Sequence, residues 1–378
     1  MNIVFALIPE KGHINPYIGP AQVLAQRGHQ VTVLAPADIS GQIGAAGLQF
    51  APDLIPAMPP SRPTHGAELV ELIQDPPRLA QWIEELLLTA IPPQVETLRQ
   101  ALRRLAASAV VIDPLYYAAA IAAHAEAVPW ASVSNSLNPV LPPELDSALL
   151  QTTRALHARR LAIFNAYGLT PEFRGCDVLS PYLTIAFTTE ALCGPVAGVK
   201  LAGPSFPIRS RGDEVPLHPL PDGKPIVYAS FGSQIYHWPE IFAKLQAAAE
   251  VAGVHLVLAA GELHDRFQAY RYAPQQEILQ RARLFITHGG ANSFMESIAA
   301  GVPMLLSPMC NDQFHQAYFL ERSRIGRVMD LRTATVPAIA EAIAALCGDG
   351  EHRAAIAALA RTYQHNGAVG AADWIEAL

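Results

Sequence analysis

Polar residues gather in one stretch of the sequence at positions where strands are expected to end. A short apolar run at 283–287 is followed by His288-Gly289-Gly290 and by a helical pattern that opens at Ala291. The first amides of a helix and the positive end of its dipole attract anions, and glycines let a phosphate approach the backbone. This turn therefore predicts a seat for a phosphate group.

A carboxylate lies one helical turn beyond this seat, because Glu296 follows Asn292 by four residues on the same helix face. It would repel a bare phosphate, but it can accept hydrogen bonds from sugar hydroxyls. Together these residues predict a nucleoside diphosphate as ligand. Each one alone has a simpler explanation: His288 as a turn residue, Asn292 and Ser293 as helix caps, Glu296 as a solvated side chain and Asp312 as a turn former. Only their combined spacing favours a binding site.

In order and spacing, this stretch resembles the signature sequence of the UDP-glycosyltransferases, family-1 enzymes with the GT-B fold. The matching residues are Tyr272, Pro274, Gln275, His288, Gly290, Asn292, Ser293, Glu296, Asp312 and Gln313. The resemblance implies that Tyr272 stacks on the base, that Glu296 binds the ribose and that Asp312 and Gln313 bind the sugar. Ala273, within the same stretch, and Ser233, in the loop after the run that begins at Ile226, are also expected to contact the donor.

The spacing within the stretch and three differences from the plant enzymes show which members of the family the chain resembles. Between Gln275 and His288 the stretch is two residues shorter than in plant enzymes, so it resembles bacterial members, in particular macrolide and carotenoid glucosyltransferases. Tyr272 stands where plant enzymes have Trp, Ala291 replaces a Trp that approaches the sugar, and Gln316 stands where Asn often follows. These departures concern the choice of sugar more than nucleotide binding.

Two more residues follow predicted strands in the N-terminal half. The run 2–8, the loop PEKGHINP, a helical pattern over 17–27 and the run 31–35 predict an opening β-α-β unit, with His13 in the loop. Asp113 follows the apolar run 109–112. In a doubly wound sheet, ligands bind outside the carboxyl ends of the strands, so both residues lie at the expected edge.

From the residues alone, a solvated loop histidine is the simpler explanation of His13, and a turn-forming Asp before Pro114 is an alternative for Asp113. The family resemblance implies a catalytic pair instead. His13 lies in Gly12-His13-Ile14-Asn15-Pro16, which matches the loop that carries the family's catalytic base. Asp113 corresponds to the aspartate that pairs with it.

The expected architecture is α/β, with two Rossmann-like doubly wound parallel-sheet domains that face each other across a cleft, as in GT-B enzymes. We expect an acceptor-binding domain at 1–205, a proline-containing linker at 206–225, a nucleotide-sugar-binding domain at 226–365 and a last helix at 366–378 that packs back on the first domain. The proline-rich run 50–77 has no clean periodicity, which indicates an irregular loop. Acceptor contacts are expected there and in the loop after Ser134.

Composition excludes several classes of protein. The chain has 378 residues, 51% hydrophobic and 16% charged, with a net charge of −7, which argues against a nucleic-acid partner. Asp113-Pro114 interrupts the most apolar run, 109–123, so no integral membrane segment is expected, and the sequence predicts a cytoplasmic protein, monomeric or homodimeric. The four cysteines show no paired spacing, so neither a disulfide framework nor a zinc site is expected.

The function that the resemblance implies is inverting transfer of a sugar, most simply glucose, from a UDP-sugar to a hydroxyl of a small apolar acceptor. His13 would take the acceptor's proton and Asp113 would hold the imidazolium. No Asp-x-Asp motif occurs, so we expect no metal. Stabilisation of the leaving diphosphate is assigned to His288, the amides of 290–293 and Ser233.

No cofactor is expected besides the UDP-sugar as co-substrate. The alternatives are a catalytically silent homologue that only binds a sugar nucleotide, a GT-B-like UDP-sugar epimerase and a lipid-linked cell-wall glycosyltransferase. An epimerase would turn over the UDP-sugar without an acceptor, and a lipid-linked enzyme would carry membrane-docking patches. The acceptor itself is left open among carotenoid, terpenoid, polyketide, macrolide and flavonoid hydroxyls.

Overall fold

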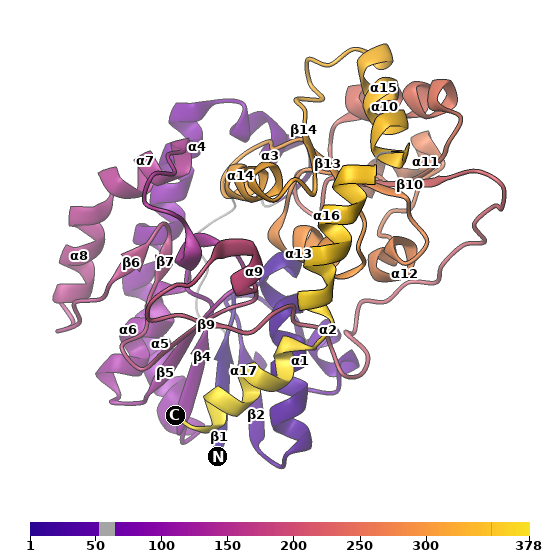
Figure 1. Cartoon of the computed structure of the whole chain (residues 1–378). Coiled ribbons are helices and arrows are strands. Elements are labelled where there is room, and N and C mark those ends of the chain that lie inside the picture. Colours follow the sequence, from indigo (N-terminus) through magenta and orange to yellow (C-terminus); the bar gives the residue numbers. More distant parts are fainter. Residues whose placement is uncertain (53–64, 349) are drawn as a thin grey trace. The chain divides into compact units, whose positions relative to one another are not determined.

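A computed structural model describes residues 1–52, 65–348 and 350–378 of the chain, which forms two compact units. Unit 1 consists of Met1–Arg62, Pro77–Glu214 and His365–Leu378, and unit 2 of Pro63–Pro76 and Val215–Gln364. Each unit is built around its own parallel sheet with helices packed on it (Figure 1). The predicted α/β fold with two parallel-sheet domains is confirmed.

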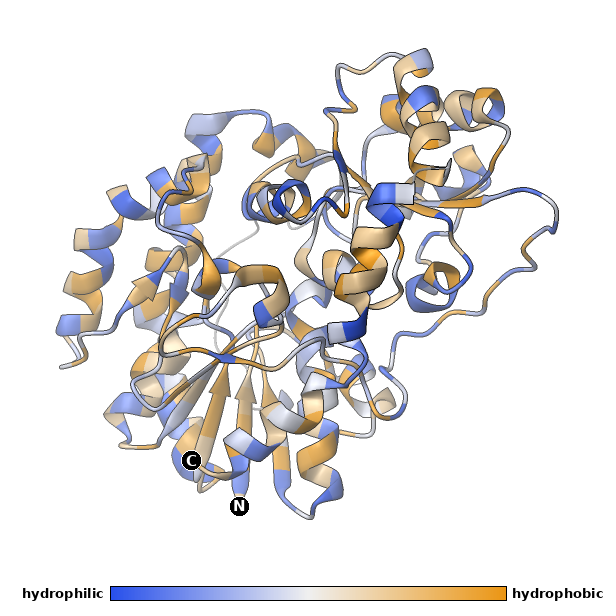
Figure 2. Cartoon of the chain, in the orientation of Figure 1, coloured by the Kyte–Doolittle hydropathy of each residue, from blue (hydrophilic) through white to orange (hydrophobic). Residues whose placement is uncertain are grey.

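The sheet of unit 1 has seven parallel strands in the order β3-β2-β1-β4-β5-β8-β9. The strands are β1 (Asn2–Ala6), β2 (Gln30–Leu34), β3 (Gln49–Phe50), β4 (Ala109–Ile112), β5 (Trp130–Ser134), β8 (Leu183–Ala186) and β9 (Lys200–Leu201). Strands covered on both faces must be apolar along their whole length, and the strands of this sheet are mostly orange in Figure 2. The order reverses between β1 and β4, as expected for the ligand-binding edge of such a sheet.

Helices cover both faces of this sheet, and a two-stranded hairpin lies beside it. The helices are α1 (Lys11–Gln26), α2 (Ser40–Ala45), α4 (Pro76–Glu84), the π-helical turn η2 (Glu85–Thr89), α5 (Ile91–Arg104), α6 (Tyr117–Ala125), η3 (Asn138–Val140), α7 (Ala148–Ala155), α8 (His157–Asn165), α9 (Glu190–Cys193) and α17 (Gly367–Glu376). The hairpin consists of β6 (Phe173–Arg174) and β7 (Asp177–Val178). One buried core contains α5 and α6, and the other contains α1 and α17.

Helix α1 corrects one prediction. The sequence pattern placed its start at Tyr17 and left His13 in a loop, but the helix begins at Lys11, so His13 lies in its first turn. The pattern misled because α1 contains Pro16 and Pro20, and proline normally ends a helix.

The two prolines are tolerated because other side chains replace the missing backbone donors. Pro16 cannot donate to the carbonyl of Gly12 four residues earlier, and Asn135 Nδ2 donates to that oxygen over 2.8 Å instead. Pro20 likewise cannot donate to the carbonyl of Pro16, which accepts from Ser205 Oγ at 2.6 Å. Residues far away in the sequence therefore complete the hydrogen bonding of α1.

The sheet of unit 2 has five parallel strands in the order β11-β10-β12-β13-β14. The strands are β10 (Ile226–Ser230), β11 (His255–Ala259), β12 (Leu284–Thr287), β13 (Met304–Leu306) and β14 (Gly326–Val328). The helices are α3 (Gly66–Ile73), α10 (Pro239–Ala252), η4 (Gly261–Leu263), α11 (His264–Phe267), α12 (Gln275–Leu279), α13 (Ala291–Ala299), α14 (Gln313–Ser323), α15 (Val336–Gly348), α16 (Gly350–Ala360) and η5 (Arg361–Tyr363).

The prediction of an irregular loop over 50–77 is wrong in part. Residues 53–64 lie outside the described chain, but 66–73 form α3, whose Leu69 and Val70 are buried. The amide of Gly66, at the start of α3, donates to the carbonyl of Gln234 over 2.7 Å. These contacts explain why α3 belongs to unit 2 although its sequence neighbours belong to unit 1.

Short strands were also missed. Strand β9, which pairs with β8 at the edge of the sheet, has only two residues. Neither the β6–β7 hairpin nor β14 was predicted, because strands of two or three residues are too short to show a periodicity of two.

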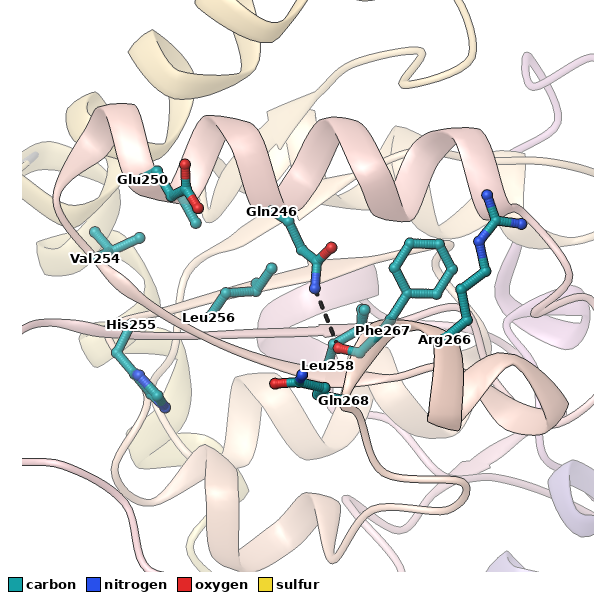
Figure 3. A pocket seen from close by; sticks show the side chains of 10 residues that line it. Gln246, Glu250, Val254, His255, Leu256, Leu258, Arg266, Phe267 and Gln268 are labelled. Atoms are coloured by element: carbon teal, nitrogen blue, oxygen red, sulfur yellow. Dashed lines mark hydrogen bonds between the residues drawn. The ribbon is translucent and has the colours of Figure 1, made fainter.

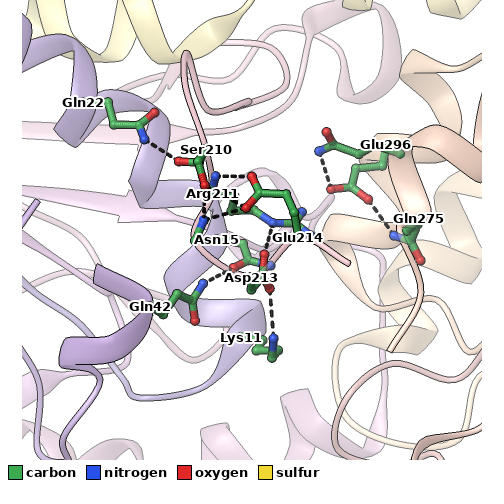
Figure 4. Close-up of polar contacts among 12 residues, drawn as sticks. Lys11, Asn15, Gln22, Gln42, Ser210, Arg211, Asp213, Glu214, Gln275 and Glu296 are labelled. Carbon is green, nitrogen blue, oxygen red and sulfur yellow. Dashed lines mark hydrogen bonds and ion pairs between the residues drawn. The ribbon is translucent and has the colours of Figure 1, made fainter. Parts of the chain in front are cut away.

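The segment after β9 is anchored to α1 by the side chains of Gln22 and Lys11 (Figure 4). Gln22 Oε1 accepts from the amide of Ile208, and Gln22 Nε2 donates to the carbonyl of Ser210 at 2.6 Å. Lys11 forms an ion pair with Asp213 at 2.9 Å. Residues 205–214 are therefore a fixed part of unit 1, although they contain no helix or strand.

Candidate functional site

Unit 1 brings His13 and Asp113 together. Strands β1 and β4 are neighbours, and Ala6 pairs with Ile112, so Asp113 leaves the sheet at the level where β1 passes into α1. His13 Nδ1 lies 2.6 Å from Asp113 Oδ2. The aspartate side chain is completely buried, whereas 24% of the histidine side chain is exposed. The two residues are a hundred positions apart in the sequence, and they meet because β1 and β4 are neighbours in the sheet.

The surroundings of Asp113 fix its carboxylate. Its Oδ1 accepts from the backbone amide of Leu115 at 3.0 Å, so both carboxylate oxygens have partners. When Nδ1 of His13 carries the proton shared with Asp113, Nε2 is the nitrogen that can accept another one. This arrangement suits a general base whose second nitrogen is held by a carboxylate.

A residue that sequence reasoning did not assign to this pair holds the start of α1. Asn135 was expected only to contact an acceptor or sugar, as part of the loop after β5. Its amide instead donates to the carbonyl of Gly12, the residue before His13. Pro16 has no N–H to donate to the carbonyl of Gly12, so the sequence indicated that another donor was needed there. Nothing in the sequence showed which side chain would supply it.

More polar groups lie beneath the pair. The hydroxyl of Tyr17 donates to the carbonyl of Val133, in β5. Asp177, in the β6–β7 hairpin, accepts from Ser134 Oγ at 2.5 Å and from Asn138 Nδ2 at 2.7 Å. Tyr17 and Asp177 are each only 1% exposed. Neither was a predicted site residue, because no motif distinguishes them from core residues.

In unit 2, helices α12 and α13 bring Gln275 and Glu296 together (Figure 4), and Ser293 lies beside them. Gln275 Nε2 lies 2.6 Å from Glu296 Oε2 and 3.2 Å from Ser293 Oγ. Gln276, which was not predicted, donates to Glu296 Oε1 at 2.9 Å. Two glutamine side chains therefore orient the carboxylate that is expected to bind the ribose.

The imidazole of His288 is enclosed between two glycines. A Cβ on Gly232 would lie 2.8 Å from His288 Cε1, and a Cβ on Gly290 would lie 2.6 Å from its Nε2, so both positions require glycine. Burial lowers the pKa of His288 to about 4, although the backbone of Ser230 opposes that shift. Within the described part of the chain, His288 Nδ1 is buried and lacks a hydrogen-bond partner. His288 is therefore neutral near pH 7, with one polar atom left for a ligand.

The remaining donor residues lie on the same elements of unit 2. Ser233 follows β10 in the loop that contains Gly232, and it is half-buried like Tyr272 and Asn292. Ala273 is 5% exposed, and its carbonyl accepts from the amide of Gln275 at 2.8 Å.

The simpler explanation of Asn292 and Ser293 as helix caps does not hold. The N-cap residue of α13 is Gly290, which precedes both of them and makes no side-chain capping hydrogen bond. The backbone amides at the start of α13 are therefore not used by an N-cap side chain, as an anion seat requires.

Asp312 and Gln313 differ in what they contact. Gln313 is 7% exposed, and its Oε1 accepts from the amides of Met309 and Cys310 at 2.8 and 3.1 Å, which fixes the turn before α14. Asp312 is half-buried, and its Oδ2 accepts from Gln316 Nε2 at 3.1 Å. Gln316 thus orients Asp312 from the position where the family often has Asn. Of the two predicted sugar-binding residues, Asp312 is the more accessible.

One surface pocket of unit 2 lies away from these residues. It has a volume of about 440 Å³ and is lined by α10, β11 and the segment 266–268 (Figure 3). Gln246 crosses it and donates to the carbonyl of Phe267 at 3.1 Å. None of the predicted donor residues lines this pocket, so it does not correspond to the candidate site.

Residues 1–52, 65–348 and 350–378 contain neither a candidate metal centre nor a candidate membrane span. No group of three or more His, Cys, Asp or Glu side chains in that part of the chain could hold a metal ion. No helix there combines the length and the apolar character needed to cross a membrane. All four cysteines are free thiols, with Cys176, Cys193 and Cys310 buried and Cys347 half-buried.

Comparison with known proteins identifies relatives of the whole chain. The family model described as "UDP-glucoronosyl and UDP-glucosyl transferase" matches residues 222–374. The NDP-glycosyltransferase YjiC of Bacillus licheniformis is 26% identical, over 98% of this chain and 96% of that protein. The oleandomycin glycosyltransferase of Streptomyces antibioticus is 26% identical, over 100% and 90%. The zeaxanthin glucosyltransferase of Pantoea ananas is 26% identical, over 81% and 79%.

Solved structures agree on the fold. The glycotransferase of kitacinnamycin superposes with a TM-score of 0.77 at 21% identity, covering 99% of this chain and 98% of that one. SsfS6 of Streptomyces sp. SF2575, complexed with thymidine diphosphate, gives 0.71 at 20% identity, covering 100% and 99%. The matched region of the family model contains the signature residues from Tyr272 to Gln313. The expected resemblance is thus confirmed: residues 222–374 match the model of the UDP-glycosyltransferase family, and the whole chain has the fold of the GT-B glycosyltransferases.

Proposed function

We propose that the protein transfers a sugar from a nucleoside diphosphate sugar to a hydroxyl of a small apolar acceptor, with inversion at the anomeric carbon. The observation that carries this proposal is the 2.6 Å contact between His13 Nδ1 and the buried carboxylate of Asp113. An alcohol has a pKa far above 7, so a base must take its proton as the new bond forms. His13 is the base in this proposal, and Asp113 is the group that stabilises its charged form.

The reaction is a single displacement. The acceptor oxygen forms a bond to the anomeric carbon while the bond from that carbon to the diphosphate oxygen breaks, and the acceptor's proton moves to His13 Nε2. One displacement at the anomeric carbon inverts its configuration. The electron pair of the broken bond leaves with the nucleoside diphosphate, whose added negative charge must be stabilised.

We assign that stabilisation to His288, Ser233 and the backbone amides at the start of α13, with no metal ion. Two features support the assignment: the absence of a side-chain cap on α13 and the buried, unpartnered Nδ1 of His288 among the described residues. Fixed dipoles that are oriented before the reaction act on a developing charge without reorganisation. Glu296 would bind the ribose and Asp312 the sugar, while Tyr272 would stack on the base.

The relatives suggest the substrates. Two of them are named for oleandomycin and zeaxanthin, which are apolar molecules with hydroxyl groups, and we propose an acceptor of this kind. We propose UDP-glucose as donor on the basis of the signature residues. The neighbour complexed with thymidine diphosphate makes dTDP-glucose the alternative to be tested. A cytoplasmic location and the absence of further cofactors are part of the same proposal.

A mass-spectrometric screen tests the whole proposal. Macrolide, carotenoid, terpenoid, polyketide and flavonoid acceptors are incubated with UDP-glucose or dTDP-glucose, with and without a chelator. We expect products heavier by one hexose, equal yields with the chelator, and β-linked sugar in the proton spectrum from the α-linked donor. An α-linked product would overturn inversion. Donor binding without transfer to any acceptor would favour a silent homologue, and donor conversion without acceptor would favour an epimerase.

A further inference from the structure

A buried tyrosine passes beneath Asp113. Tyr17 belongs to α1, which follows β1, whereas the carbonyl to which it donates belongs to Val133 in β5. Strand β4 lies between β1 and β5 in the sheet, and Asp113 directly follows β4. The Tyr17 side chain must therefore span the end of β4 to reach Val133. Its hydroxyl donates a hydrogen bond to the carbonyl of Val133, and Asp113 also acts on Tyr17 through its charge and through a side-chain hydrogen bond.

A second buried carboxylate acts on the same hydroxyl. Asp177 is 1% exposed and is held by Ser134 and Asn138. Burial raises the pKa of Tyr17 well above its usual value, and the negative charges of Asp113 and Asp177 raise it further. Both carboxylates are thus close enough to Tyr17 to interact with it electrostatically, and the tyrosine is held neutral between them.

Other charged and titratable groups in this region oppose or leave unchanged the effect of Asp177. His13 lies in the first turn of α1, where the helix dipole disfavours a positive charge. The buried Arg160 donates to the hydroxyl of Tyr117, on which Asp177 also acts, so part of the carboxylate's field is offset. Tyr116, beside Asp113, has its pKa raised by burial and stays neutral. Lys11 is paired with Asp213.

We propose that Tyr17 and Asp177 are positioning residues of the His13–Asp113 pair. Tyr17 supports the Asp113 side chain from below, and the negative charge of Asp177 strengthens the hold of His13 on the proton that it takes from the acceptor. This inference rests on the proposed role of His13 as the base. It assigns a role to two buried polar residues that the reaction itself does not use.

The charge of Asp177 is tested by Asp177→Asn, which keeps the shape of the side chain. The control is Ser134→Ala, which removes a hydrogen bond to Asp177 but leaves its charge. The readout is the NMR titration of the His13 imidazole, assigned by the loss of its signal in His13→Ala. We expect the titration midpoint of His13 to fall by about half to one pH unit in Asp177→Asn, because a nearby negative charge is lost. It should be almost unchanged in Ser134→Ala.

Kinetics give a second readout. In Asp177→Asn, kcat should fall about two- to fivefold at its pH plateau with the donor KM unchanged, since a weaker base transfers the proton less readily. Tyr17→Phe keeps the ring and removes the hydroxyl, and its kcat should fall by a similar factor, again with the donor KM unchanged. Circular dichroism and thermal melting verify that each variant is folded.

The outcomes separate the two proposals. An unchanged His13 midpoint in folded Asp177→Asn, or an equal shift in Ser134→Ala, overturns the inference, because the effect would then not follow the charge. If Asp177→Asn does not fold, the inference is tested with Tyr17→Phe. An unchanged kcat in Tyr17→Phe overturns the role of Tyr17, whether or not the donor KM rises. Near-normal turnover by His13→Ala overturns the proposed base, whatever the NMR titration gives.

Discussion

The two candidate half-sites are built differently. In unit 1 the key carboxylate, Asp113, is completely buried, and each of its oxygens already has a partner. In unit 2 the carboxylate of Glu296 is half-buried and accepts hydrogen bonds from the side-chain amides of two glutamines. The histidines differ in the opposite sense: His13 is partly exposed, whereas His288 is buried and neutral near pH 7.

The difference fits the two tasks that we propose. A proton-transferring group needs a fixed orientation and a raised basicity before the substrate arrives, so its carboxylate is buried and fully bonded. A ligand-binding surface needs polar groups that exchange their partners for those of the ligand. Changes in unit 1 should therefore alter the rate constant, and changes in unit 2 should alter the affinity for the donor.

The largest effect is expected for His13→Ala. Without a base for the acceptor proton, kcat should fall by about a hundred- to ten-thousandfold, while UDP affinity measured by calorimetry should hardly change. An aliphatic alcohol should be used as acceptor, because a phenol, with a pKa of about 10, loses its proton more easily without help. Near-normal turnover on the aliphatic acceptor would remove the role of base from His13.

The double variant sharpens this prediction. Asp113→Asn should also be slow, and in the double variant with His13→Ala the two losses in rate should not add, because the carboxylate then has no imidazole to orient. Steady-state rates of the four proteins give the interaction energy. Additive losses would show that the two residues act independently in spite of their 2.6 Å contact.

The next largest effect is expected for Glu296→Ala. Losing hydrogen bonds between a carboxylate and ribose hydroxyls should weaken UDP binding about ten- to a hundredfold. The control is Gln276→Ala, which removes only a neighbour that orients this carboxylate and should cost less. Calorimetry with UDP measures both. If UDP binds Glu296→Ala as tightly as it binds the unmodified protein, the ribose is bound elsewhere.

A smaller and more selective effect is expected for Asp312→Ala. UDP affinity should be retained, while UDP-glucose should bind about three- to tenfold more weakly, because only the second ligand carries the sugar. Calorimetry with the two ligands on the same preparation gives the comparison. Equal weakening of both would indicate that Asp312 acts on the turn before α14 rather than on the sugar.

The smallest effect concerns pH. The pKa of His288 is about 4 in the free protein, and a bound diphosphate should raise it, because an anion favours the imidazolium. Binding of UDP-glucose should therefore strengthen as pH falls from 7 towards 5, by a factor of a few. His288→Asn should abolish the change. UDP-glucose is the appropriate ligand, since its phosphates do not titrate in this range. The buried His315, whose pKa burial also lowers, remains as a background in both proteins.

Sequence reasoning predicted the long elements well and the local detail less well. The limits of β4 agree with the structure, because an apolar run that ends directly before Asp113 marks them clearly. The start of α1 was wrong because the donors that replace Pro16 and Pro20 come from Asn135 and Ser205, which no local pattern reveals. Contacts of this kind depend on the tertiary fold.

The same limit applies to the site. The motif spacing indicated Glu296 and His288 as site residues. It did not show that Gln276 donates to Glu296 or that two glycines enclose His288. The pairing of His13 with Asp113 could be expected because the family resemblance implied it and because adjacent parallel strands end at one edge. Asp177 could not be found, because its partners come from another strand and a short 3₁₀-helix.

The discontinuous make-up of unit 1 has a consequence for synthesis on the ribosome. Helix α17 packs on α1 so closely that a Cβ on Gly19 would lie 2.8 Å from Ala368 Cβ, and Asn366 bonds to the backbone of Phe206. Unit 1 therefore cannot complete its folding until the last residues of the chain leave the ribosome. Until then, the apolar residues that pack against α17 are exposed to water. Truncation after residue 364 should thus cause nascent chains to aggregate, although it leaves unit 2 and its donor residues intact.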